Sequence, residues 1–273
     1  MANKKSAPRA KSATKPAANR ATPKRKVSPA KLWIEGARLR TLPLAIAPVL
    51  IGWGAAGSIQ SFKAPLAWLA LAVALFLQIG VNYANDYSDG IKGTDDNRVG
   101  PTRLVASGLA SAKSVKQAAF LSFAIAAVVG SILALQSSLW LLAVGAAAIF
   151  AAWTYTGSKR PYGYLGLGEI SVFIFFGVVA TMGSYFVQTE LITWQSFIVS
   201  IPMGALACSI LAINNLRDRA QDDLVGKRTL AVRLGDAGAR KLFISLLVLA
   251  HVAAISIPSE NTLITLALLP QTV

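Results

Sequence analysis

The residues best suited to chemistry form two clusters of carboxylate and amide side chains. The first cluster comprises Asn82, Asn85, Asp86 and Asp89. Their spacing of i, i+3, i+4 and i+7 places all four on one helix face, provided that the apolar helix before them continues through the motif. Such a face presents several oxygen ligands in one direction.

The second cluster comprises Asn214, Asp218 and Asp222, which are spaced four residues apart and also share a helix face. Each cluster follows a long apolar stretch. An Asp at membrane depth costs roughly 2.5–3.5 kcal/mol, and ionisable residues there usually mark a functional site. A divalent cation relieves this cost and the mutual repulsion of the carboxylates. Mg²⁺ takes carboxylate oxygens and keeps positions for waters and phosphates. Two opposed clusters therefore predict a site for magnesium and a diphosphate group; the alternative is two solvated loops with helix caps.

Basic side chains near the clusters suit phosphate oxygens. They are Lys92, Arg98, Arg103, Lys159, Arg217 and Lys227. Gly90 and Gly93 allow a ligand to approach the backbone closely. They form neither a GxGxxG nor a Walker pattern, so the sequence does not predict a nucleotide site.

A third candidate is the pair Tyr155 and Lys159, four residues apart at the end of an apolar stretch. On spacing alone, the pair is equally well explained as an interfacial anchor, because Tyr and Lys are common at membrane surfaces.

Long apolar stretches must position these residues. The chain has 273 residues, of which 54% are hydrophobic and 14% charged. Stretches of about 17–22 apolar residues are long enough to cross a bilayer as helices. We therefore predict an all-α, polytopic transmembrane helical bundle. The expected spans lie near 39–59, 66–81, 115–135, 139–155, 165–187, 194–213 and 242–257, with part of an eighth from Leu263. Because the eighth is cut at Val273, we expect the chain to be C-terminally incomplete.

Charge is distributed unevenly along the chain. Twelve of the 27 Lys and Arg residues lie within the first 40 positions. Residues 1–28 are basic and lack apolar periodicity, which predicts a disordered tail before a transmembrane domain at 29–273. All but one of the remaining basic residues lie in or beside three long polar loops, at 82–114, 156–164 and 214–241. Positive charge marks the cytoplasmic side, so we expect the N-terminus and these loops to face the cytoplasm at the cell membrane. The tail suits anionic lipid, and we expect no nucleic-acid partner.

Together these motifs resemble the UbiA superfamily of intramembrane aromatic prenyltransferases, over nearly all the chain after the tail. The family pattern is an NDxxDxxxD-like motif, a YxxxK motif and a DxxxD motif; here they read NDYSDGIKGTDD, YTGSK and DRAQD. The longer wording, YTGSKRPYGYLGLGE and NNLRDRAQDDLVGKRTLAVRLG, is similar to the branch that acts on 1,4-dihydroxy-2-naphthoate in menaquinone synthesis. Gly93 stands where the family usually has a third Asp, and Asp95 is its expected replacement. The family normally has nine transmembrane helices.

The resemblance implies a magnesium-dependent enzyme that moves a polyprenyl group from polyprenyl diphosphate to 1,4-dihydroxy-2-naphthoate. Diphosphate and carbon dioxide leave, and the product is demethylmenaquinone. The implied metal ligands are Asn85, Asp86, Asp89, Asp95, Asn214, Asp218 and Asp222. The implied diphosphate contacts are Asn82, Arg98, Arg103, Lys159, Asn215, Arg217 and Lys227. The implied catalytic residues are Asp89, Asp218, Lys159 and Tyr155, with Tyr155 steadying an allylic cation or positioning the acceptor.

Three alternatives remain at this point. A sister prenyltransferase would use another aromatic acceptor such as 4-hydroxybenzoate, although that branch usually has an RPL sequence where this chain has Arg103-Leu104. A CDP-alcohol phosphotransferase shares the DxxDG start of Asp86 to Gly90, but its motif differs from this chain after Gly90. An ion-coupled transporter would use the Asp residues as ion sites, usually near mid-membrane in broken helices.

Overall fold

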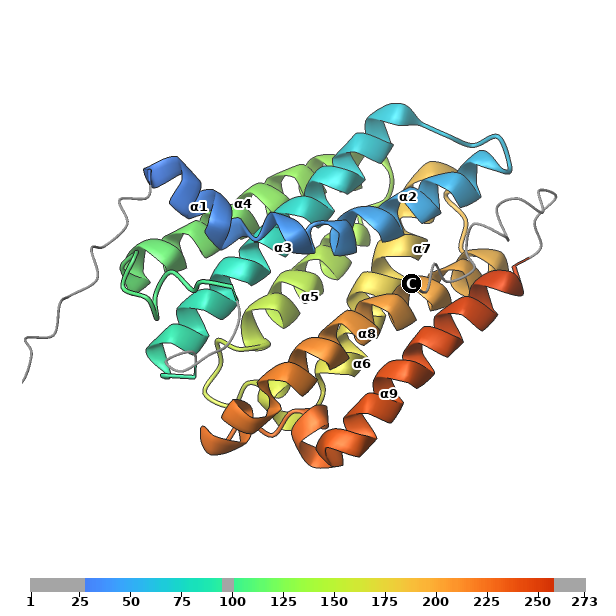
Figure 1. The fold of residues 1–273 in the computed structure, drawn as a ribbon. Coiled ribbons are helices and arrows are strands. Elements are labelled where there is room, and N and C mark those ends of the chain that lie inside the picture. The colour runs from blue at the N-terminus through green and yellow to red at the C-terminus, as the bar shows by residue number, and fades with distance from the viewer. Residues whose placement is uncertain (1–27, 95–100, 258–273) are drawn as a thin grey trace, which may run out of the picture.

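The computed structural model describes residues 28–94 and 101–257. All the regular secondary structure in this part of the chain is helical, without strands. Its elements, shown in Figure 1, are α1 (Pro29–Ala37), η1 (Leu39–Thr41), α2 (Pro43–Gly57), α3 (Ala64–Ile91), α4 (Ala112–Gln136), α5 (Leu141–Thr154), η2 (Tyr162–Leu165), α6 (Gly168–Val172), the π-helix η3 (Phe173–Val179), α7 (Ala180–Thr189), α8 (Trp194–Leu224) and α9 (Leu230–Ile255).

Five helical segments are long and apolar enough to cross a membrane: α3, α4, the continuous segment Gly168–Thr189, α8 and α9. A sixth span forms if α1 with η1 and α2, bent by 51° at their junction, cross together. The outward faces suit lipid, since Leu135 and Phe150 are 75% and 71% exposed. The predicted all-α membrane bundle is therefore confirmed, and the protein is a multi-pass membrane protein.

Each of the seven predicted spans corresponds to a helical segment. The fourth, α5, has only 14 residues, or about 21 Å of helix, which is less than the bilayer core. The predicted start of an eighth span at Leu263 and the predicted tail at 1–27 lie outside the described residues.

The structure differs from the predicted spans in where helices begin and end. Helix α3 continues to Ile91 and α8 to Leu224, so both acidic clusters are helical. Helical structure begins again at Leu230, well before the expected start at Leu242, although the non-helical backbone of Gly235 (φ 70°) breaks α9 after its first turn. Its first turn is capped by the Thr229 side chain, which accepts a hydrogen bond from the amide of Val232. The many charges after Leu230 make this turn resemble a loop in the sequence.

Glycines let the helices approach closely. A Cβ at Gly80 of α3 would lie 2.4 Å from the Phe123 ring of α4, and one at Gly177 would lie 2.5 Å from the Gly204 backbone of α8. Small residues at helix contacts are typical of membrane bundles, where dispersion contacts replace a hydrophobic driving force.

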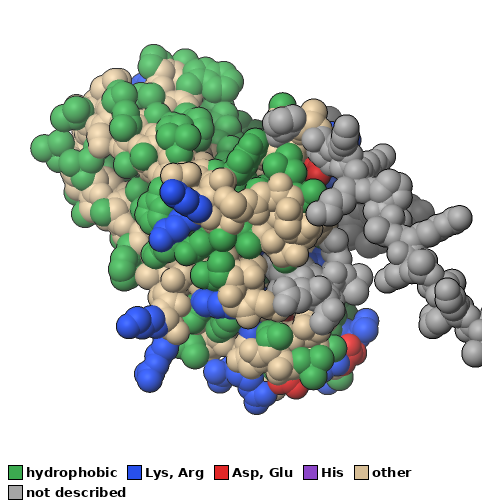
Figure 2. Space-filling model, turned by 90° about the vertical axis from the view of Figure 1, so that its left-hand side faces the viewer, with side chains coloured by type: hydrophobic (Ala, Val, Ile, Leu, Met, Phe, Trp, Pro, Cys, Tyr) green, Lys and Arg blue, Asp and Glu red, His purple; other side chains and the backbone are tan. Residues whose placement is uncertain are grey.

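The polar ends of α3, α5 and α8 gather at one end of the bundle (Figure 1). On the face shown in Figure 2, Lys and Arg side chains lie mainly in the lower part, and the upper part is largely apolar. The helices thus carry both acidic clusters to the same end.

Candidate functional site

The C-terminal parts of α3 and α8 face each other across a polar cavity of about 480 Å³. Carboxylates, amides and basic groups from both helices and the adjoining loops line it. From the predicted site they are Asn82, Asn85, Asp89, Arg103, Tyr155, Asn214, Asn215, Arg217, Asp218, Asp222 and Lys227. Eleven residues predicted from sequence are thus brought to one cavity.

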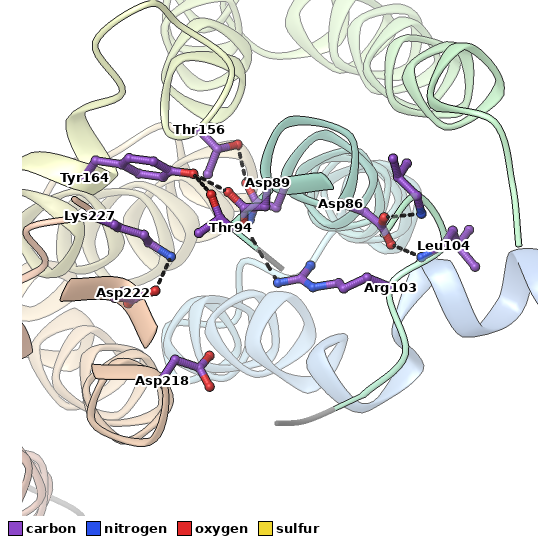
Figure 3. Close-up of polar contacts among 12 residues, drawn as sticks. Asp86, Asp89, Thr94, Arg103, Leu104, Thr156, Tyr164, Asp218, Asp222 and Lys227 are labelled. Carbon is purple, nitrogen blue, oxygen red and sulfur yellow. Dashed lines mark hydrogen bonds and ion pairs between the residues drawn. The ribbon is translucent and has the colours of Figure 1, made fainter. Parts of the chain in front are cut away.

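Asp89 is held from two sides, as Figure 3 shows. The hydroxyl of Tyr164, in η2, donates a 2.8 Å hydrogen bond to Asp89 Oδ1. Arg103 Nη2 lies 3.9 Å from Asp89 Oδ2, and both side chains are almost completely buried. The segments after α3 and after α5 therefore fix the orientation of this carboxylate.

The carboxylates of α8 lie opposite. Asp222 Oδ1 is 3.3 Å from Lys227 Nζ, while its buried Oδ2 has no hydrogen-bond partner among the described residues. Arg217 donates to both oxygens of Asp218, at 2.7 and 2.8 Å. The carboxylate of Asp218 points into the space between the helices (Figure 3).

Asp86 is not brought to the cavity, in contrast to the predicted metal role. It is fully buried, and its two oxygens accept hydrogen bonds from the amides of Leu104 and Val105, at 2.9 and 3.0 Å. Residues 85 and 86 differ by about 100° around the helix, so when Asn85 and Asp89 face the cavity, Asp86 faces the loop after the helix. The carboxylate holds the loop that carries Arg103.

Lys159 is also not brought to the cavity; its side chain is exposed. Nearby, Lys92 Nζ donates to the carbonyl oxygens of Thr156 and Ser158. Burial lowers the pKa of Lys92, and the negative charge of Asp89 opposes that shift. Lys92 thus ties the end of α3 to the loop after α5. The predicted Asp95 and Arg98 lie outside the described residues.

The sequence prediction missed several cavity residues. The N-terminal segment contributes Arg38, at a left-handed φ of 54°, and Thr41, while Gln78 comes from the middle of α3. Gln78 carried a usable signal, because an amide within an apolar span is costly without a partner. Arg38 had no such signal, since its place in the cavity depends on the bend between α1 and α2.

A second cavity, of about 380 Å³ and lined almost entirely by apolar side chains of α2 to α5, η3 and α7, adjoins the polar one. Four residues line both cavities: Gln78, Tyr155, Val172 and Phe176. We call these four residues the neck. Tyr155, predicted to be catalytic, therefore lies where a polar site meets an apolar chamber.

Sequence comparison agrees with this geometry. The model of the UbiA prenyltransferase family matches residues 45–272. This chain belongs to the UbiA prenyltransferase family. Family membership confirms the predicted resemblance and a prenyl-transferring enzyme, and it argues against the phosphotransferase and transporter alternatives.

Relatives of this UbiA-family chain are close in sequence. It is 55% identical over 220 residues to a 1,4-dihydroxy-2-naphthoate octaprenyltransferase of Mycobacterium tuberculosis, covering 81% of this chain and 75% of the relative. It is 39% identical over 228 residues to the Escherichia coli enzyme of the same name, covering 81% and 74%.

Solved UbiA structures share the fold. A UbiA homolog from Archaeoglobus fulgidus bound to DMAPP and Mg²⁺ superposes with a TM-score of 0.65 at 14% identity, covering 86% of this chain and 81% of the homolog. The same homolog bound to GPP and Mg²⁺ gives a TM-score of 0.66. At this identity, the similarity establishes the fold.

The donor set of this UbiA-family site suits magnesium. Within the described residues, no three acidic, Cys or His side chains converge on one point as a preformed metal site. Mg²⁺ needs no such cluster, because it is usually held by one or two carboxylates plus phosphates and waters. The unpartnered Oδ2 of Asp222 and the Asp218 carboxylate are oxygen atoms that could ligate a metal from one side, and Asp89 and Asn85 carry such oxygen atoms on the other.

Proposed function

We propose that this protein transfers a polyprenyl group from polyprenyl diphosphate to 1,4-dihydroxy-2-naphthoate, in menaquinone biosynthesis. The observation that carries the proposal is the junction of two unlike cavities at the neck. A polyprenyl diphosphate has a charged end and a long apolar tail. Its reactive carbon lies between them, and in this site that carbon falls at the neck.

The charged end belongs in the polar cavity. Asp89 and Asn85 on α3, with Asn214, Asp218 and Asp222 on α8, would hold Mg²⁺. When bound, the metal neutralises charge that develops on the departing diphosphate. Lys227, Arg103 and Arg38 line the same cavity and supply positive charge for the phosphate oxygens.

The neck suits the carbon that becomes cationic. Tyr155 and Phe176 present aromatic rings there, and a ring face attracts a cation by roughly 0.5–2 kcal/mol. Tyr155 is held from both ends: its amide donates to the carbonyl of Ala151 at 3.0 Å, and its carbonyl accepts from the amide of Gly163 at 3.1 Å. The apolar cavity beyond the neck takes the tail and keeps water away from the cation.

The bond changes balance without an added oxidant. The bond between the prenyl carbon and the diphosphate oxygen breaks, and the diphosphate keeps the electron pair. The ring carbon that bears the carboxylate forms the new bond to the prenyl carbon. Carbon dioxide then leaves, and its bonding pair restores the aromatic ring, giving the quinol form of demethylmenaquinone.

The naphthoate acceptor is inferred from the relatives named above, at 55% and 39% identity. Their names also specify an octaprenyl donor. The walls of the apolar cavity define no chain length, so we propose only a polyprenyl group for this chain.

We further propose that residues 29–273 form one transmembrane domain and that the polar cavity opens to the cytoplasm at the cell membrane, with the basic tail against anionic lipid. The excess of Lys and Arg at the cavity end supports this orientation. In a Cys208→Ser background, Ser158→Cys and Ile192→Cys should label from opposite sides with a membrane-impermeant thiol reagent. Labelling of position 158 from outside intact cells would contradict it.

The function is tested with the purified protein in lipid nanodiscs, Mg²⁺, geranylgeranyl diphosphate and 1,4-dihydroxy-2-naphthoate. We expect a prenylated naphthoquinone by mass spectrometry and one diphosphate per product. Asp89→Asn and Asp218→Asn should each abolish turnover. Asp218→Asn should leave the thermal melt unchanged, whereas Asp89→Asn should lower it, because the ion pair with the buried Arg103 is weakened. Normal turnover in either variant would show that the two opposed carboxylates do not form the metal site.

A further inference from the structure

Gln78 is the polar group of the neck that the proposed chemistry leaves without a task. It lies in the middle of α3, is only 5% exposed, and lines both cavities. A buried amide in an apolar helix is costly unless its donor and acceptor atoms are both paired.

The neighbouring hydrogen bonds determine which amide atom is available. The Thr41 hydroxyl donates its only hydrogen to the carbonyl of Arg38, at 3.0 Å. Thr41 Oγ1 can therefore only accept from Gln78, so the atom 3.0 Å away is the amide nitrogen Nε2. A second donor, Asn82 Nδ2, approaches the same Oγ1 at 2.9 Å and also donates to the carbonyl of Ala37, at 2.8 Å.

This network fixes the side chain of Gln78 with its nitrogen toward Thr41. Its carbonyl oxygen Oε1 is buried and accepts no hydrogen bond from any described residue. Leaving a buried acceptor unpaired is unusual in folded proteins and calls for an explanation such as a ligand. The donor substrate offers none, because a polyprenyl diphosphate has no hydrogen-bond donor at the carbon that reacts.

The aromatic acceptor does offer one. Its ring must reach the prenyl carbon at the neck, and it carries two hydroxyl groups, each with one hydrogen to donate. We propose that Gln78 Oε1 accepts a hydrogen bond from one hydroxyl of the dihydroxynaphthoate and so selects and orients the acceptor ring. This inference rests on the proposed function. A site built to pair a substrate hydroxyl discriminates against analogues that lack it.

The test measures equilibrium binding of three ligands to the full chain in nanodiscs. The ligands are 1,4-dihydroxy-2-naphthoate and its two mono-hydroxy analogues, 1-hydroxy-2-naphthoate and 4-hydroxy-2-naphthoate. On the unaltered protein, one analogue should bind about tenfold more weakly than the parent, the size expected for one hydrogen bond at about 1.4 kcal/mol. The other should bind within about threefold of it. If neither analogue binds more weakly than the parent, the proposal is wrong, and this result needs no variant.

The variant Gln78→Met keeps the length of the side chain and removes the amide. It should weaken binding of the parent by about tenfold and leave the affected analogue unchanged, because that analogue has already lost the bond. Affinity for geranylgeranyl diphosphate with Mg²⁺ should stay within about twofold. The matched control is Gln188→Met, a similarly buried amide in α7 that lines neither cavity, which should leave all four affinities unchanged.

Two outcomes separate this inference from the function on which it rests. An equal loss for the parent and both analogues in Gln78→Met would mean that Gln78 acts only through the Thr41 and Asn82 network, and would overturn the inference alone. If the unaltered protein does not bind the naphthoate but binds another aromatic acid, the proposed function is wrong, and the inference with it.

Discussion

Asp86→Asn gives a sharp test of the site, because it separates the loop-anchoring role of Asp86 from a metal-binding one. Both oxygens of the carboxylate accept backbone hydrogen bonds, at 2.9 and 3.0 Å, and the residue is fully buried. Asparagine has one acceptor oxygen, so its NH₂ group would face one of the two amides. One charge-assisted hydrogen bond is lost, at roughly 1.5–3 kcal/mol, and one buried amide is left unpaired, at roughly 1–3 kcal/mol.

The expected loss of stability is therefore about 3 kcal/mol, which corresponds to a melting temperature lower by on the order of 5–10 °C. Turnover should fall as well, because the loop from Leu104 to Val105 adjoins Arg103, whose guanidinium lies 3.9 Å from Asp89. The Mg²⁺ concentration that gives half-maximal activity should stay within about twofold, since no ligand has been removed.

The assay pairs magnesium titrations with thermal melts on Asp86→Asn and Asp218→Asn. Asp218→Asn should show the opposite pattern, with a normal melt and a magnesium requirement at least about tenfold higher, or no activity at all. A normal melt in Asp86→Asn together with a raised magnesium requirement would refute the loop-anchoring role and restore Asp86 as a ligand.

Two further predictions concern a lysine of the polar cavity and a glycine at a helix contact. Lys227→Ala should raise KM for the prenyl diphosphate about tenfold or more, because a largely buried cation beside Asp222 is lost from the polar cavity. Lys159 is exposed, so Lys159→Ala should change this KM less than about twofold. A larger KM increase for Lys159→Ala than for Lys227→Ala in steady-state kinetics would contradict the assignment. Gly52→Ala should destabilise the fold by about 1–3 kcal/mol, because the new Cβ would lie 2.6 Å from the backbone oxygen of Thr181. Gly54→Ala, with no atom within 4 Å of the new Cβ, should be neutral or stabilising in the same thermal melt, and equal losses in both variants would show that α2 and α7 do not pack as described.

The membrane bundle was predictable because the bilayer imposes long apolar helices, and that pattern is visible in composition alone. Helix ends were less predictable. The charges after Leu230 resemble a loop, yet a capped helical turn begins there and the rest of α9 follows after a break at Gly235, because charged side chains can lie on the polar side of a helix outside the bilayer core.

The site was predictable where helical spacing determines it. Asn85 and Asp89, or Asp218 and Asp222, must share a face once the helix continues through them. Spacing could not decide the role of Asp86. The four residues of the first cluster cover a wide helix face, and a residue at the edge of that face, such as Asp86, can contact either the cavity or a loop. Arg38 and Tyr164 reach the site through tertiary packing, and nothing local in the sequence indicates that.

The role of Tyr155 remains a prediction. The neck position is the one its predicted role requires, but the spacing to Lys159 that suggested the motif does not bring Lys159 to the cavity. Two other lysines make contacts here. Lys227 pairs with Asp222 in the polar cavity, and Lys92 donates a hydrogen bond to the loop after α5.

The central claim is that the prenyl group replaces the carboxylate of a naphthoate. It is tested most directly with carboxyl-labelled 1,4-dihydroxy-2-naphthoate and, separately, carboxyl-labelled 4-hydroxybenzoate, each with the protein in nanodiscs, Mg²⁺ and a polyprenyl diphosphate. We predict one labelled carbon dioxide released per prenylated naphthoquinone formed, and no product from 4-hydroxybenzoate. Label retained in a prenylated 4-hydroxybenzoate, with no product from the naphthoate, would contradict the account and leave only the fold and the family.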